Sequence, residues 1–290
     1  MAWKRHNPGC PCCCPCACYK FNGDGDAACQ GLDLTATSAS YGTGKFVQED
    51  ENEAANFTGS AYFEHEDKTC FNLGETDPRI IEREGINVWF WLRANHDAPY
   101  SWELSTTEPE GIVSKGDWDK SGHEAYDFDG EWGIFWDSTS PSDEFVGNVW
   151  FLVGNGSGNP YDANAISKGA KGDNAYETAG NKWEFYFFWV SIYEGKVYVI
   201  KDDEDTEEES LSGTQTKVSD KKLYVGNNTE GKKLGEQTYG GVARPWLLDN
   251  VGFCKEIGTK EEMEERAANL YNDGEGRVCN HAGLTDSECC

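Results

Sequence analysis

The stretch LLDNVGFCKEIGTKEEMEERAANLYNDG, residues 247–274, predicts a buried strand followed by a helix. The helix begins with a capping box, in which the Thr259 hydroxyl caps the first turn and Glu262 returns the hydrogen bond. A glycine, Gly274, follows its end, as is typical of helix C-termini. One face of this helix carries four apolar or aromatic side chains: Met263, Ala267, Leu270 and Tyr271. We therefore expect a helix over 259–271 that packs on a sheet.

Upstream of this stretch, the pattern is that of β-strands. NKWEFYFFWVSIYEGKVYVIKDD (181–203) indicates a hairpin, in which Glu194-Gly195 turns between two apolar runs. Residues 86–94, INVWFWLRA, are apolar on both faces, which favours a central strand. Further short runs alternate with turn residues: 61–63, 132–136, 149–153, 223–226 and 246–253. Such spacing predicts an all-β protein built as a two-sheet antiparallel sandwich.

In this order the elements resemble the concanavalin A-like lectin/glucanase superfamily, specifically its laminin-G-like jelly-roll domains. The matching segments are NFTGSAYFE (56–64), INVWFWLRA (86–94), GIVSKGD (111–117), residues 181–203, KLYVGNN (222–228) and residues 247–274. The resemblance implies a jelly-roll sandwich over 40–275 with one C-terminal helix. A Cys-rich arm over 1–39 and a Cys-containing C-terminal tail over 276–290 lie outside it. Such domains serve as lectins, adhesion modules, glycosidases and structural parts, so the fold leaves the function open.

The cysteines lie towards the two ends of the chain and leave a long middle without any. They are Cys10, Cys12, Cys13, Cys14, Cys16, Cys18, Cys29, Cys70, Cys254, Cys279, Cys289 and Cys290. We expect disulfides, at least one of which joins one end to the other or to a neighbouring subunit. A bridge between distant positions stabilises by about 4–5 kcal/mol in the loop-entropy model. The alternative is a zinc–thiolate cluster, but its usual second knuckle is missing unless Cys289 and Cys290 supply it.

The formal charge is −27, from 52 acidic against 25 basic residues. This balance argues against nucleic acid and anionic membrane surfaces as partners. No run approaches the ~20 apolar residues of a membrane span. The start, MAWKRHNPGC, lacks the apolar region of a signal peptide. Disulfides without an export signal indicate release by lysis, as for a virion, a non-standard exporter, or a mature form of the chain. We expect an extracellular or virion-surface location.

A catalytic signature is missing from the sequence. Retaining glucanases of this fold carry E-x-D-x-E on a strand, where the alternation places three carboxylates on one face. EDENE (49–53) lacks the central aspartate, and DEDTE (203–207) begins with aspartate and lacks apolar spacers. We therefore predict that the protein is not an enzyme. The acidic run DDEDTEEE (202–209) is interpreted as a solvated loop, with a weak cation site as the alternative.

Calcium is the cofactor that the sequence allows. Residues 22–33 place oxygen ligands at positions 1, 3, 5 and 12 of a calcium-type loop, but position 6 is Ala27 instead of glycine. A second site is suggested by two aspartates after the SKGD match, because related domains bind calcium at the sheet edge. The candidate ligands are Asn22, Asp24, Asp26, Asp33, Asp117 and Asp119. Ordinary turns are the alternative interpretation.

Glycan binding requires exposed aromatic side chains beside polar groups. The aromatic residues in or next to loops between strands are Trp118, Tyr126, Trp132, Trp136 and Tyr161. Burial in the sandwich core is the alternative for each of them. The resulting hypothesis is a non-catalytic structural and adhesive subunit of a virion or extracellular filament, which self-associates and has glycan recognition as a secondary role. The alternatives are a free-standing carbohydrate-binding protein and a glycoside hydrolase.

Overall fold

The structure is a computed structural model of the chain. It describes residues 16–21, 23–26, 32–46, 52–68, 71–73, 85–94, 110–119, 127–137, 148–154, 164–169, 182–211, 220–227, 232–236, 238–239, 242–243, 245–255 and 257–276.

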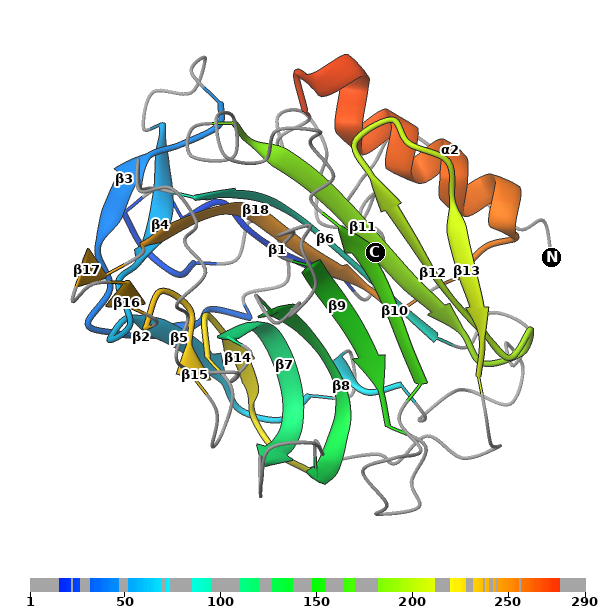
Figure 1. The fold of residues 1–290 in the computed structure, drawn as a ribbon, viewed down its shortest axis with the longest axis horizontal. Helices are drawn as coiled ribbons and strands as arrows, with labels where there is room; N and C mark the ends of the chain where they lie inside the picture. Colours follow the sequence, from blue (N-terminus) through cyan, green and yellow to red (C-terminus); the bar gives the residue numbers. More distant parts are fainter. Residues whose placement is uncertain are drawn as a thin grey trace, which may run out of the picture.

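Two sheets stack face to face (Figure 1). Sheet A has the order β13 (Glu207–Ser210), β12 (Lys196–Lys201), β11 (Glu184–Ser191), β6 (Gly85–Ala94), β18 (Trp246–Cys254), β4 (Glu53–Phe57) and β3 (Tyr41–Thr43), with β1 (Cys16–Tyr19) paired to β18. Sheet B has the order β10 (Asn164–Gly169), β9 (Asn148–Val153), β8 (Asp127–Asp137), β7 (Glu110–Asp119), β14 (Leu223–Val225), β5 (Tyr62–His65) and β2 (Thr35–Thr37). The short strand β15 (Lys232–Lys233) runs parallel to β7, and β16 (Thr238–Tyr239) pairs with β17 (Val242–Ala243). The predicted all-β class with two antiparallel sheets is confirmed.

Strand β6 lies in the middle of sheet A, between β11 and β18, as its two apolar faces predict. Phe90 points into the core between the sheets, where it stacks on Tyr186 at 5.5 Å between ring centroids. Trp89 and Trp91 point to the opposite face of the same sheet. Because neither face of this strand meets water, most of its side chains are apolar, as the sequence predicted.

Helix α2 (Lys260–Tyr271) covers the outer face of sheet A (Figure 1). The predicted capping box is present: the Thr259 hydroxyl accepts a hydrogen bond from the Glu262 amide, and the Glu262 carboxylate accepts one from the Thr259 amide. The buried side chains of the helix are Met263, Ala267 and Leu270. These side chains pack with Trp89 and Trp91 and form a second apolar layer on the outer face of sheet A. This layer explains why both faces of β6 are buried. In the described part of the chain, no helix has the length and apolar character to cross a bilayer.

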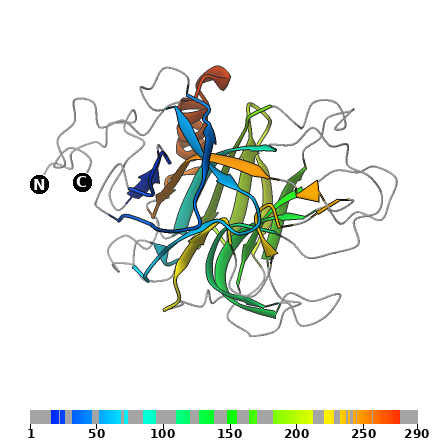
Figure 2. The same ribbon diagram turned by 90° about the vertical axis from the view of Figure 1, so that its left-hand side faces the viewer.

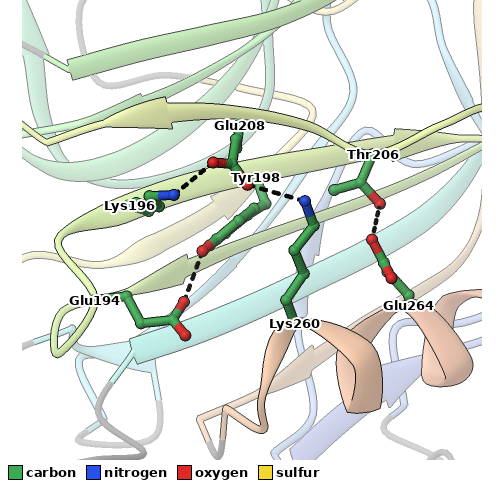
Figure 3. A network of polar contacts seen from close by, with 7 residues as sticks. All are labelled: Glu194, Lys196, Tyr198, Thr206, Glu208, Lys260 and Glu264. Carbon is green, nitrogen blue, oxygen red and sulfur yellow. Dashed lines mark hydrogen bonds and ion pairs between the residues drawn. The ribbon is translucent and has the colours of Figure 1, made fainter.

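Polar contacts fasten the start of α2 to the edge strand β13 (Figure 3). The Glu208 carboxylate accepts from the ammonium groups of Lys196 on β12 at 2.5 Å and Lys260 on α2 at 2.9 Å. The Thr206 hydroxyl donates to Glu264 of the helix at 2.6 Å. The acidic run expected to be a loop thus contains a strand, because lysines on both sides compensate part of its charge.

Residues 16–19 of the cysteine-rich arm form β1, which lies beside β18 in both views (Figures 1 and 2). Strand β18 changes register between Asp249 and Gly252, and its residues 246–248 pair with β4 whereas 251–254 pair with β1. The Tyr19 ring enters the core between the sheets, and its hydroxyl donates to the Leu32 carbonyl at 2.8 Å. Residues 16–19 of the arm therefore belong to sheet A.

Candidate functional site

Two of the aromatic residues predicted to bind glycan are core residues. Trp132 is 0% exposed, and its indole nitrogen donates to the Phe71 carbonyl at 2.7 Å. Trp136 is 4% exposed and packs on Trp246, with ring centroids 5.1 Å apart. Both point inward because residues 132, 134 and 136 share the core face of β8. A buried ring cannot stack on a sugar, so the prediction is wrong for these two.

The other predicted glycan and calcium residues are only partly visible. Tyr126, Tyr161 and Asn22 lie outside the described residues, and of Trp118 only the backbone, within β7, is described. Asp117 and Asp119 lie on β7, where the register sets them opposite Asp129 and Asp127 of β8. The structure describes the backbone of these four aspartates, so their role as calcium ligands stays a prediction.

Asp24, Asp26 and Asp33 lie close enough to interact. The charges of Asp24 and then Asp33 raise the pKa of the exposed Asp26 carboxyl. Asp24 Oδ1 accepts the Asp26 amide at 3.1 Å, as in an ordinary turn. Within the described residues, no three carboxylate, histidine or cysteine side chains converge as a metal site. Calcium at this loop therefore stays a prediction.

Two cysteines, Cys18 and Cys254, lie on the helix-covered face of sheet A. Cys18 is half of a disulfide. Cys254 is a buried thiol rather than half of a disulfide, which departs from the expectation. The register sets Cys16 opposite Cys254. The remaining cysteines lie outside the described residues: Cys10, Cys12, Cys13, Cys14, Cys29, Cys70, Cys279, Cys289 and Cys290.

A surface group of aromatic and charged side chains lies on the outer face of sheet B, where β5 and β14 pair. Phe63 points into the core, so its neighbours Tyr62 and Glu64 point outward. Tyr224 lies opposite Glu64 in the register and shares that outer face. The residues of this group, which we call the tyrosine patch, are Tyr62, Glu64, Lys222, Tyr224 and Lys233.

The two tyrosines of the patch form an aromatic pair. Their ring centroids are 6.2 Å apart and the ring planes are inclined by 57°. Both side chains are half-buried, so each ring keeps part of its surface open to solvent. Tyrosine has only two side-chain torsions and loses little entropy on binding, which suits it to recognition surfaces.

Charged groups stand at both ends of this pair. Beyond Tyr224, the Lys222 ammonium bridges Glu64 at 2.8 Å and Glu66 at 3.0 Å, and these bonds raise its pKa. Beyond Tyr62, the Lys233 ammonium lies 5.7 Å from the ring centroid, in cation–π geometry. The patch thus offers two ring faces between hydrogen-bonding groups.

Backbone bonds hold the segment that carries Lys233 in place. The Leu234 amide donates to the Gly226 carbonyl at 3.1 Å, and the Gly59 amide donates to the Leu234 carbonyl at 3.1 Å. The Leu234 side chain is itself buried in the core. The patch therefore sits on fixed backbone rather than on a free loop, which lowers the entropy cost of binding.

Sequence reasoning missed the tyrosine patch because it searched loops for aromatic residues. The signal was present in the string AYFEH (61–65), whose alternation puts Tyr62 and Glu64 opposite Phe63. That Tyr224 joins them depends on strand pairing, which one sequence does not reveal.

No protein-family model and no curated protein matches the chain. Several solved structures are similar to it. The binding domain of Paraclostridial Mosquitocidal Protein 1 is similar at a TM-score of 0.53 and 10% identity, over 83% of this chain and 48% of that one. The binding domain of Botulinum Neurotoxin serotype G is similar at 0.52 and 9%, over 82% and 47%. A third structure, described as a receptor binding domain, is similar at 0.51 and 10%, over 91% and 51%. The chain spans about half the length of these structures. At such identities the likeness establishes a shared β-sandwich fold.

Proposed function

We propose that the protein is a non-catalytic binding subunit whose tyrosine patch recognises a saccharide. The observation that supports this best is the pair of half-exposed rings of Tyr62 and Tyr224 between charged groups. The apolar C–H face of a pyranose ring packs on an aromatic ring, while its hydroxyls bond to polar groups at the rim. Structures that share the fold are described as binding domains, which agrees with a role in recognition.

The wider proposal is an adhesive and structural subunit with a concanavalin A-like, laminin-G-like jelly roll, exposed on a virion or an extracellular filament. Cysteines towards both ends of the chain and the disulfide at Cys18 support an oxidising location and covalent links. Self-association through such links is part of the proposal. It is tested by light scattering of the purified protein before and after reduction. A protein that is monomeric under both conditions contradicts the self-association.

Saccharide binding is tested on a glycan array with the full chain and three variants. Tyr62→Ala and Tyr224→Ala should each weaken binding at least about tenfold, equivalent to ~1.4 kcal/mol. Tyr62→Phe should bind better than Tyr62→Ala, because the ring is kept.

The matched control is Tyr193→Ala, since Tyr193 is 63% exposed in the turn between β11 and β12 and lies outside the patch. This variant should bind as well as the parent protein. Unchanged binding in both patch variants would place the site elsewhere. Release of reducing sugar from a β-glucan would show a glycoside hydrolase and overturn the non-catalytic assignment.

A further inference from the structure

We infer that the saccharide recognised at the tyrosine patch carries an acidic substituent, a carboxylate or a sulfate ester, and that Lys233 binds it. This inference rests on the proposed function. It adds the chemical class of the ligand and assigns the residue that selects it.

The first observation is that positive and negative charges are balanced at the patch, unlike in the chain as a whole. The chain as a whole carries −27. Among the described residues, two lysines, Lys222 and Lys233, stand at the patch with two glutamates, Glu64 and Glu66. At physiological ionic strength charges act over about 8 Å, so this local balance governs what binds at the patch surface.

The second observation separates the two lysines that flank the rings. Lys222 is compensated by Glu64 and Glu66, so it carries little net attraction for an anion. Within the described residues, the Lys233 ammonium contacts the Tyr62 ring and forms no ion pair. The uncompensated charge of the patch is therefore at Lys233.

The third observation explains why nearby carboxylates leave Lys233 available. Glu236 Oε2 accepts the backbone amide of Lys233 at 2.9 Å. Glu110 Oε2 is buried and accepts the Gly235 amide at 3.0 Å. Both carboxylates thus bind the main chain of the turn that carries Lys233. They fix the position of this residue while its side chain extends over Tyr62.

These contacts define a binding geometry. A sugar ring stacked on Tyr62 and Tyr224 has Lys233 at its edge, on the side away from the Lys222 ion pair. An acidic group on that edge of the sugar completes the ion pair that Lys233 lacks in the described structure. A neutral sugar leaves it unused, so selectivity between the two follows from this one contact.

The experiment is isothermal titration of the full chain at physiological salt with three probes. They are a glucuronate-containing oligosaccharide, its carboxyl-reduced neutral counterpart and a sulfated form of that counterpart. We expect one acidic probe or both to bind at least about tenfold more tightly than the neutral one. Lys233→Gln should abolish this preference, while Lys233→Arg should keep it.

The matched control is Lys182→Gln, an exposed lysine before β11 of the other sheet, which should keep the preference. Equal or tighter binding of the neutral probe by the parent protein overturns the inference but leaves saccharide recognition standing. A preference that survives in Lys233→Gln also overturns it. Absence of binding to all three probes and to the glycan array overturns the proposed function together with the inference.

Discussion

Replacement of Tyr19 by alanine tests whether β1, within the cysteine-rich arm, belongs to the sandwich core. The Tyr19 side chain is 0% exposed and packs against Phe21 and Phe253, with ring centroids 6.2 Å and 6.0 Å away. Truncation of a fully buried aromatic ring costs about 3–5 kcal/mol, because transfer energy is lost and a cavity remains. We expect Tyr19→Ala to lower the free energy of unfolding by about this amount.

A second variant separates the ring from its hydroxyl. Tyr19→Phe keeps the packing but leaves the Leu32 carbonyl without the hydrogen bond that it now accepts. The expected loss is about 1 kcal/mol. The two variants should therefore differ by several-fold in their effect on stability, and the ring should account for most of it.

The assay is urea denaturation of the oxidised protein, followed by tryptophan fluorescence. A loss of 4 kcal/mol should lower the midpoint by roughly 1 M urea, given m-values near the upper end for single domains. Tyr193→Ala serves as the exposed control and should change stability by less than about 0.5 kcal/mol. If Tyr19→Ala behaves like this control, β1 is an appendage and its place beside β18 is refuted.

Three further outcomes are expected. Gly252→Ala should lower the free energy of unfolding by about 1–3 kcal/mol or more, because a Cβ there would lie 2.0 Å from the Trp89 ring. The yield of folded protein should fall as well. A variant that melts like the parent protein contradicts this contact. Glu208→Gln should lower stability at neutral pH and match the parent in acid, since the ion pairs lower the folded pKa of Glu208 and their contribution disappears as pH falls through that value. A difference in stability between Glu208→Gln and the parent protein that stays the same at all pH values contradicts this expectation. Asp26→Asn should raise the denaturation midpoint at neutral pH in EDTA, because neighbouring charges raise the pKa of Asp26 and their repulsion grows as pH rises through that value. If this loop binds calcium, the parent protein should have the higher denaturation midpoint in millimolar calcium. If Asp26→Asn still has the higher midpoint there, a calcium site in this loop is refuted.

The elements that sequence predicted best are those whose signals are local. The hairpin at Glu194-Gly195 joins β11 to β12, and the capping box at Thr259 starts α2. Residues 86–94 are a central strand because both faces of sheet A are covered, one by sheet B and one by the helix. In each case the signal lies in neighbouring residues, so one sequence is enough to predict the element.

The elements that sequence missed have distant causes. Strand β1 pairs with residues 251–254 of β18, beyond the part of β18 that pairs with β4. Strand β13 forms from an acidic run that pairs with β12, and lysines of β12 and α2 bind its Glu208. The inward direction of Trp132 likewise depends on which face of β8 meets sheet A. Proximity to a loop therefore could not show whether this ring was exposed.

The tyrosine patch depends on a local signal, the alternation in β5, and on a distant one, the pairing of β5 with β14. Val225 and Phe63 pair across β14 and β5 and both lie in the core, so the neighbouring pair Tyr224–Glu64 must face outward. A shift of one residue in this pairing would turn Tyr224 inward and expose its apolar neighbours, at a large cost in buried area. The hydrophobic core that specifies the register thus also specifies the surface. It follows that the backbone positions of the two tyrosines are set before any ligand arrives, and that changes in Phe63 or Val225 should disturb binding although neither residue belongs to the patch.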